Sequence, residues 1–481
     1  MERKLRVETL IYGAGRYGSI VVTLLTTVVL SHILSPEEYG VTAVTAVFSS
    51  FFTVVADMGF GTAVIQNKTL TDGEVNDIFS FSVYASLALG ALFALLGFPI
   101  AVFYGNPAYR KICALLSLAV TFTGMNIVPH GVVMKGKRFR VAGLRLITLN
   151  LATGALAILM ALAGFSYYAL VLQSVMYAFL VFVWNFCHVK LKFRLRVNMK
   201  SVRRVSGFSM YQFAYSLVNY LSGNFDHFLI SRAMGSVGLA YYDKSYRLMM
   251  YPVQNLTYVI SPIIHPVLSE HQDDRRYIYD AYMKIVRALS LAGVLIAAVC
   301  FSASREIILL FFGAQWESSA SVFRILAPAV WPMMVVSSAK AIYQSTGNTR
   351  LLLRSGGICF GAGAVLTAAG VMTGSLETTA RCVAAALYLR FFIDYYFLIV
   401  RNFGYGYGAF LRSFRGEACI AAGMAAAIAA LEHLPAMHLL AGMAVKGGVL
   451  LAVFVAAAAA TGQLKPVREF LHRRRHNRKN R

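Results

Sequence analysis

Long apolar runs recur along the whole chain, and they constrain its fold more than any other feature. A helix needs about 20 apolar residues to cross the hydrocarbon core of a bilayer, and about fourteen runs approach that length. Short turn-forming segments such as residues 35–38 (SPEE) and 105–107 (GNP) separate them. The runs cover residues 9–33, 40–64, 77–103, 110–133, 143–164, 166–188, 207–232, 237–266, 281–303, 319–345, 353–373, 377–400, 416–431 and 438–461. The sequence therefore predicts an all-α polytopic membrane protein with about fourteen transmembrane helices.

The composition excludes the main alternatives to a membrane protein. Of the 481 residues, 58% are hydrophobic and 14% are charged, whereas a typical soluble domain has about 25% charged residues. A disordered chain would not be so rich in apolar side chains, and six cysteines are too few for a disulfide scaffold. Lys and Arg outnumber Asp and Glu by 45 to 21. A soluble nucleic-acid-binding domain could not bury this much apolar surface, however, so we expect no nucleic-acid partner.

The excess of positive charge follows the connections between the runs. The first run is long and no A-x-A-like site follows it, so we interpret it as a membrane helix and not as a signal peptide. From a cytoplasmic N-terminus, alternate connections hold most of the Lys and Arg residues, as the positive-inside rule requires. The pattern predicts that both termini are cytoplasmic. We interpret the basic tail at residues 465–481 as a topology determinant, with attraction to anionic membrane lipid as the alternative.

The runs form two like-oriented sets of six, separated by the basic connection at residues 190–206. The turn between the first two runs of each set lies at residues 34–43 and at residues 234–243, an offset of 200 positions. Parallel repeats related by an axis along the membrane normal are a transporter architecture. We predict an N-lobe at residues 1–205, a C-lobe at residues 206–402, and two further helices with the basic tail at residues 403–481.

Ionisable residues inside the predicted spans are candidates for function, because charges in a bilayer are costly and tend to face a partner or a cavity. Spacing places three acid–base pairs at matching depth or at i,i+4 positions. The pairs are Arg16 with Asp57, Asp226 with Lys244, and Arg390 with Asp394. Structural ion pairing is one interpretation, and exposure to a cavity is the other.

Further cations lie in the spans without an acid assigned to them by spacing. These are Arg247, Arg324 and Lys340. A surplus of positive charge inside the spans suits an anionic cargo, and phosphate is the natural candidate because Lys and Arg both bind it. Lys340 lies near the inner end of its run, so snorkelling to the interface is the alternative for this residue.

Tyrosines cluster on the seventh and eighth runs. If they line a polar cavity, Tyr220, Tyr242 and Tyr246 would offer a sugar both a flat ring and a hydroxyl group. An interfacial aromatic belt or helix packing is the alternative interpretation.

Neither a metal site nor a catalytic site is expected. The six cysteines are scattered through apolar segments without metal-ligand spacing, and the histidines are equally dispersed. No nucleophile, base and orienting group form a recognisable constellation. The sequence thus predicts a protein that is not an enzyme and that holds no cofactor.

Four segments carry a recognisable pattern: residues 34–40 (LSPEEYG), 56–66 (ADMGFGTAVIQ), 224–232 (NFDHFLISR) and 246–254 (YRLMMYPVQ). Together they resemble the Wzx-type polysaccharide flippases, and within these the colanic-acid and teichuronic-acid exporter branch. The resemblance extends over roughly residues 10–400. It implies the fold of the multidrug/oligosaccharidyl-lipid/polysaccharide (MOP) exporters, in which two six-helix lobes surround a cavity and two extra helices follow.

The resemblance also implies a function. Such flippases move oligosaccharides on undecaprenyl diphosphate across the bacterial cytoplasmic membrane by alternating access, alongside a polysaccharide polymerase and glycosyltransferases. It implies that cavity cations hold the diphosphate and that H⁺ or Na⁺ drives transport. Relatives with a defined sodium site have additional acids on the run that corresponds to residues 353–373, where this sequence has none. The predicted diphosphate ligands are Arg16, Lys244, Arg247 and Arg324, and the predicted coupling or ion-pair acids are Asp57, Asp226 and Asp394.

Two other functions compete with the flippase. A multidrug or small-molecule cation antiporter of the same fold is expected to have fewer cavity cations and a more acidic and aromatic lining. A membrane polysaccharide polymerase or glycosyltransferase is expected to carry a sizeable external loop with acidic or arginine chemistry. The longest external connection, residues 304–318, holds only Arg305, Glu306 and Glu317 as charged residues. The sequence therefore favours the flippase.

Overall fold

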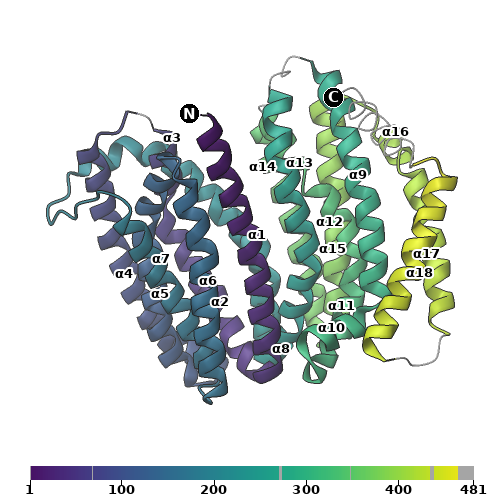
Figure 1. Ribbon diagram of the computed structural model, residues 1–481, viewed down its shortest axis with the longest axis horizontal. Coiled ribbons are helices and arrows are strands. Elements are labelled where there is room, and N and C mark those ends of the chain that lie inside the picture. The colour runs from purple at the N-terminus through teal and green to yellow at the C-terminus, as the bar shows by residue number, and fades with distance from the viewer. Residues whose placement is uncertain (1, 68, 270–273, 347, 434–437, 464–481) are drawn as a thin grey trace. The chain divides into compact units, whose positions relative to one another are not determined.

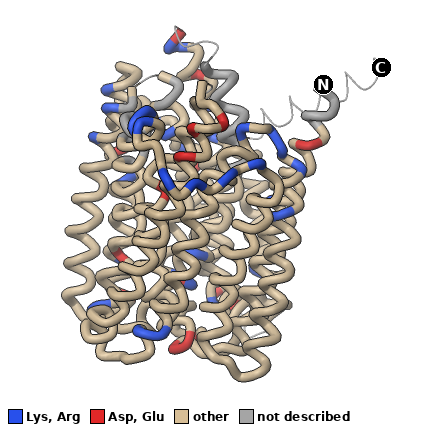
Figure 2. The backbone as a smooth tube through the Cα atoms, turned by 90° about the vertical axis from the view of Figure 1, so that its left-hand side faces the viewer, with Lys and Arg blue, Asp and Glu red and all other residues tan. Residues whose placement is uncertain are grey.

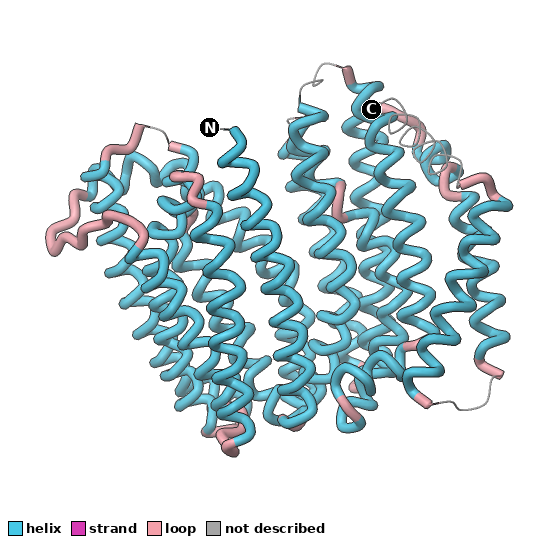
Figure 3. The backbone as a smooth tube through the Cα atoms, in the orientation of Figure 1, coloured by secondary structure: helices cyan, strands magenta, loops and turns pink. Residues whose placement is uncertain are grey.

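The computed structural model describes residues 2–67, 69–269, 274–346, 348–433 and 438–463, and these residues are almost entirely helical (Figures 1 and 3). No strand occurs in that part of the chain. The chain divides into two units, Met1–Ala240 and Tyr241–Arg481. The all-α class predicted from the apolar runs is confirmed. The lobe boundaries predicted at residues 205 and 402 stay predictions, and the basic tail from residue 465 onward lies outside the described residues.

Unit 1 begins with a capped helix hairpin. Ser35 and Glu38 form a capping box, in which the Ser35 hydroxyl accepts from the backbone N–H of Glu38 and the Glu38 carboxylate accepts from the N–H of Ser35 at 2.7 Å. The chain therefore turns at residues 34–35, within the first predicted turn. The helices of this unit are α1 Glu2–Ile33, α2 Pro36–Asp57, α3 Phe60–Gln66, α4 Asp72–Tyr104, α5 Ala108–Lys135, α6 Phe139–Leu162, α7 Tyr168–Cys187 and the first arm of α8 Met199–Ser269.

The helix α8 bends at Gly235, which has φ 72° and ψ −174°. Glycine adopts this conformation readily because it has no Cβ. The bend lies within the second predicted turn, residues 234–243, and divides α8 into two arms. A Cβ on Gly40 of α2 would lie 2.2 Å from the carbonyl oxygen of Ser236. The two turns that the sequence pairs as a repeat therefore touch each other through their backbones.

Unit 2 contains shorter helical pieces than its apolar runs suggest. The predicted run at residues 319–345 is divided by a 3₁₀ turn, Ala327–Ala329, because Pro328 cannot donate a helical hydrogen bond. A π-helical segment, Phe397–Phe403, extends α15. The helices are α9 Arg275–Ser302, α10 Ser304–Phe312, α11 Glu317–Leu326, α12 Val330–Val336, α13 Ala339–Ser345, α14 Thr349–Met372, α15 Leu376–Tyr396, α16 Tyr407–Arg412, α17 Arg415–Leu431 and α18 Leu439–Ala460.

Eleven helical segments among the described residues are long and apolar enough to cross a membrane. The protein is therefore a multi-pass membrane protein. The three other predicted runs lie in α8 and in α17. The helix α17 has 17 residues, and α8 carries five Asp, Lys and Arg residues between positions 226 and 247. The number of fourteen spans stays a prediction.

Glycine allows α1 and α6 to pack closely within unit 1. A Cβ on Gly15 of α1 would lie 2.3 Å from the carbonyl oxygen of Gly143 on α6, and a Cβ on Gly143 would lie 2.8 Å from the Cα of Tyr12. Small residues give membrane helices this close backbone approach, which provides packing energy where no hydrophobic effect acts between helices.

Candidate functional site

The second arm of α8 carries a charged cluster made of Asp243, Lys244 and Arg247. The Nε of Arg247 donates to both carboxylate oxygens of Asp243, at 2.8 and 2.7 Å, across one helical turn. Asp243 is 9% exposed, whereas the Arg247 side chain is 64% exposed. A buried carboxylate thus orients an exposed guanidinium, which is the group best suited to bidentate recognition of phosphate.

Lys244 is the buried base of this cluster. The residue is 5% exposed, and its Nζ lies 4.9 Å from the ring centroid of Phe312 and 5.0 Å from that of Trp316. Aromatic faces attract a cation through their quadrupole, which offsets part of its desolvation. With one acid and two bases, the cluster has a formal charge of +1. The structure therefore places two of the predicted diphosphate ligands within one turn of each other, and their role stays a prediction.

The three predicted sugar-facing tyrosines make intramolecular contacts. Tyr220 donates its hydroxyl to the carbonyl of Val47 and so joins α8 to α2. Tyr242 is completely buried and stacks on the half-buried Tyr246 at a centroid distance of 5.7 Å. In this conformation Tyr220 and Tyr242 fit the alternative interpretation, helix packing. Tyr220 bonds to a neighbouring helix, and Tyr242 presents no ring face to a ligand.

Asp57 lies at a break that the apolar pattern did not predict. Met58 and Gly59 are left-handed, with φ 42° and 74°, so the run predicted over residues 40–64 divides into α2 and α3. The Asp57 carboxylate accepts hydrogen bonds from the backbone N–H groups of Gly59 and Gly61, which satisfies donors at the start of α3. Asp57 therefore has a structural function at this break, and its pairing with the half-buried Arg16 stays a prediction.

The other two predicted acids have close neighbours on their own helices. Asp226 accepts from the backbone N–H of His227 and from its Nδ1, both at 2.9 Å. Asp394 lies 3.4 Å from the Nε of Arg390, as the i,i+4 spacing predicted, and accepts from Cys359 at 3.6 Å. Asp226 belongs to unit 1, and its predicted pairing with a residue of unit 2 stays a prediction.

Arg324 forms contacts with residues near the C-terminal end of α17. It forms an ion pair with Glu432, directly after α17, and its guanidinium lies 4.7 Å from the ring centroid of Phe301. A neighbouring carboxylate already neutralises this cation, so Arg324 contributes less surplus charge than its position in the sequence suggested. Lys340, for which snorkelling was the alternative, is exposed at the start of α13.

Arg145 is a buried cation that the sequence pattern did not indicate. It is 7% exposed on α6, donates to Oδ1 of Asn185 at 2.9 Å, and lies 3.3 Å from Nδ1 of His130. Its Nε has no hydrogen-bond partner among the described atoms. Arg145 follows closely on the basic connection at residues 135–140, so its sequence position resembles that of a solvated loop cation. The contacts show instead that it joins α5, α6 and α7.

Replacing Arg145 with alanine is expected to destabilise unit 1. The substitution leaves the buried Asn185 carbonyl without this donor, which costs about 1–3 kcal/mol. Arg140→Ala is the matched control, because Arg140 is exposed on the same helix. Thermal unfolding of the purified proteins in detergent measures the difference. Equal melting temperatures for the two variants would show that the Arg145 contacts contribute nothing.

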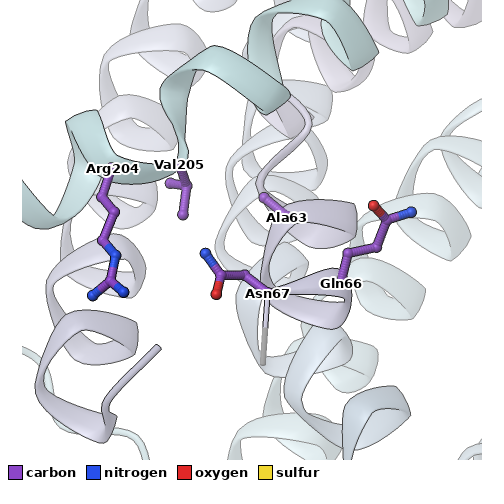
Figure 4. A pocket seen from close by; sticks show the side chains of 5 residues that line it. All are labelled: Ala63, Gln66, Asn67, Arg204 and Val205. Atoms are coloured by element: carbon purple, nitrogen blue, oxygen red, sulfur yellow. The ribbon is translucent and has the colours of Figure 1, made fainter. Parts of the chain in front are cut away.

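A pocket opens between α3 and the start of α8 in unit 1, and the Arg204 guanidinium extends toward it beside the Asn67 amide (Figure 4). Arg204 donates to Glu74 at 2.6 Å and to the Thr69 hydroxyl at 2.9 Å. Because Glu74 neutralises the guanidinium, we do not assign an anionic ligand to this pocket. Its lining residues are Ala63, Gln66, Asn67, Arg204 and Val205.

Residues 29–321 match the family of polysaccharide biosynthesis proteins, which is more than half of the chain. The chain belongs to this family. It is 22% identical to the teichuronic acid biosynthesis protein TuaB of Bacillus subtilis over 72% of each chain. It is 23% identical to the succinoglycan biosynthesis transport protein ExoT of Rhizobium meliloti, over 65% of this chain and 63% of that protein. The resemblance carried by the four sequence segments is confirmed.

The fold of this family member matches that of a solved transporter. The lipid II flippase MurJ, in an inward closed conformation, superposes with a TM-score of 0.75 at 12% sequence identity, over 95% of this chain and 99% of that one. At this identity the match establishes the fold, and it agrees with the exporter fold that the resemblance implied.

Proposed function

We propose that this protein is a flippase that moves lipid-linked oligosaccharides across the membrane for surface polysaccharide biosynthesis. Membership of the polysaccharide biosynthesis family supports the proposal, as do a relative described as a transport protein and a fold shared with a lipid II flippase. The cargo that we infer is an oligosaccharide on undecaprenyl diphosphate, and the membrane is the bacterial cytoplasmic membrane with both termini on the cytoplasmic side. Glycosyltransferases would act before it, and a polysaccharide polymerase would act after it.

The observation that carries the proposal is the oriented guanidinium of Arg247 beside the buried Lys244. A diphosphate at neutral pH is a multivalent anion, and charge-assisted hydrogen bonds from Arg are strong and directional. Asp243 fixes the guanidinium through Nε, which lowers the conformational entropy lost when a phosphate binds. Arg16 is the further cation that we assign to the diphosphate. No bond is made or broken in this process, so the proposal needs no catalytic residue and no cofactor.

Deleting the gene tests the function in cells. We expect the lipid-linked oligosaccharide to accumulate on the cytoplasmic face of the membrane while surface polysaccharide disappears, and plasmid-borne protein to restore both. A deletion strain with normal surface polysaccharide would contradict the proposal. A strain that lacks polysaccharide but makes no lipid-linked precursor would instead place the protein in synthesis.

The source of energy is a separate part of the proposal. Asp57, Asp226 and Asp394 are the acids to which we assign coupling to H⁺ or Na⁺, because a carboxylate at membrane depth can change its charge as it binds or releases a cation. Imposed pH and sodium gradients distinguish the two ions. Export that is indifferent to both gradients would remove coupling from the account while leaving the flippase function intact.

A further inference from the structure

A basic strap, residues 190–197, connects α7 to α8 without helical structure. Its sequence alternates strictly between basic and apolar residues: Lys190, Leu191, Lys192, Phe193, Arg194, Leu195, Arg196 and Val197. The strap projects beside α4 at the left of Figure 1, and the view from that side shows a loop with closely spaced Lys and Arg crossing in front of the helices (Figure 2). A connection that served only to set topology would need the charges but not the apolar residues between them.

Hydrogen bonds to α4 fix the conformation of the strap. The backbone N–H of Lys192 donates to Asn76 and that of Arg194 donates to Ser80, both at 2.9 Å. The Arg194 side chain pairs with Asp77 at 3.2 Å. At the two ends of the strap, Leu191 and Val197 pack against the core of unit 1. The strap is thus held in register along the helix.

The middle of the strap presents apolar side chains to its surroundings. Leu195 is 82% exposed and Phe193 is 45% exposed. The Phe193 ring lies 5.5 Å from the ring of Tyr84 on α4, whose hydroxyl donates to the carbonyl of Leu195 at 3.2 Å. The fold therefore holds a leucine and a phenylalanine outward where water would be an unfavourable neighbour.

Exposed cations flank these apolar residues. Lys190, Lys192 and Arg196 are exposed in the strap, and Lys200 is exposed at the start of α8. Within the described part of the chain, no carboxylate pairs with any of these four side chains. By contrast, Arg194 and Arg204 are paired with acids of α4. Of the four cations in the strap, Arg194 attaches it to the protein, and the other three are exposed together with Lys200 of α8.

We propose that the strap is a binding site for anionic phospholipid headgroups at the membrane surface. Phosphate groups of the lipids would bind the four outward cations, while Leu195 and Phe193 enter the boundary between headgroups and acyl chains. Basic residues interleaved with Leu and Phe are typical of segments that lie in this interface, and each Lys or Arg near an anionic surface strengthens binding about fivefold. The proposal concerns the membrane around the protein, and it holds whatever the cargo is.

Lipid quenching of a tryptophan at position 195 tests the site in the full-length protein. The Leu195→Trp variant is reconstituted in phosphatidylcholine vesicles that contain either brominated phosphatidylglycerol or brominated phosphatidylcholine at the same fraction. The parent protein, with its three native tryptophans, supplies the background. At low salt, we expect quenching by the anionic lipid to exceed quenching by the zwitterionic lipid about twofold or more. At about 1 M salt, where the Debye length falls to about 3 Å, the preference should disappear.

Two variants control this measurement. Val365→Trp replaces a residue that is 70% exposed in the middle of α14, and it should be quenched equally by both brominated lipids. Combining Leu195→Trp with Lys190→Gln, Lys192→Gln and Arg196→Gln should retain quenching but lose the preference. Equal quenching of Trp at 195 by both lipids at low salt would overturn the proposal. Absence of quenching by either lipid would also overturn it, because the strap would then face water or another protein.

Discussion

Replacing Arg247 with alanine is expected to abolish most export while leaving the protein in the membrane. A hydrogen bond to a charged group contributes about 1.5–3 kcal/mol, so loss of this guanidinium should lower the rate of export about 10- to 150-fold. The side chain is 64% exposed, so its removal leaves no cavity, although the buried Asp243 loses its two hydrogen bonds. Export is therefore compared per amount of protein in the membrane. The measurement is surface polysaccharide in a deletion strain, normalised to the amount of variant in the membrane.

A conservative variant and a control variant separate the effect of the planar guanidinium from the effect of its positive charge. Arg247→Lys keeps the charge but loses the planar fork that binds two phosphate oxygens, so we expect export between that of the parent and that of the alanine variant. Arg305→Ala is the matched control, because Arg305 is also an exposed arginine held by an acid, Glu317. Its export should be unchanged. Normal polysaccharide from the Arg247→Ala strain would remove this residue from the site.

Replacing Gly15 with alanine is expected to destabilise unit 1, whereas the same change two residues earlier is not. A Cβ at Gly15 meets the carbonyl oxygen of Gly143 at 2.3 Å and its carbonyl carbon at 2.7 Å. These are backbone atoms, so they can move away only if α1 separates from α6. Overpacking of this kind costs about 1–3 kcal/mol, and the loss of close helix contact adds to it.

Gly13→Ala provides the control on the same helix. Apart from the adjoining residues and backbone of α1 itself, no atom of the described residues lies within 4 Å of the Cβ that this change would add. Alanine in a helix interior is favoured over glycine by about 1 kcal/mol, so Gly13→Ala should keep or raise the melting temperature. Thermal unfolding in detergent measures the melting temperature of each variant, and the amount of protein in the membrane is a second measure of its stability. Equal melting temperatures for the two variants would mean that α1 and α6 do not pack through Gly15.

The sequence predicted those features that depend on residues close together along the chain. The apolar runs reveal helices because span length is a local property, and the pair Arg390 and Asp394 followed from i,i+4 spacing alone. The break after Asp57 was not predicted. Gly59 is a local signal for it, but a left-handed methionine at position 58 has none. The repeat of turns near residues 37 and 235 was visible in the sequence, but their contact through Gly40 was not.

Burial is the property that sequence position conveyed least well. Arg145 resembles the last cation of a basic connection, and only packing between α5 and α7 shows that it is buried. Tyr242 resembled a cavity tyrosine, yet it is enclosed by other side chains. Arg324 resembled a surplus cation, but its acid lies 108 positions away at the end of α17. Pairings at such separations depend on the tertiary fold.

Transport by the purified protein tests the central claim most directly. The protein is reconstituted in vesicles that contain an undecaprenyl diphosphate oligosaccharide, and a membrane-impermeant enzyme or lectin reports how much of the sugar reaches the outer leaflet. The flippase predicts that the accessible fraction rises with the parent protein and with Arg305→Ala, and that Arg247→Ala lowers the rate about 10- to 150-fold. A rate for the parent protein that equals that of protein-free vesicles, with and without imposed pH and sodium gradients, would contradict the account.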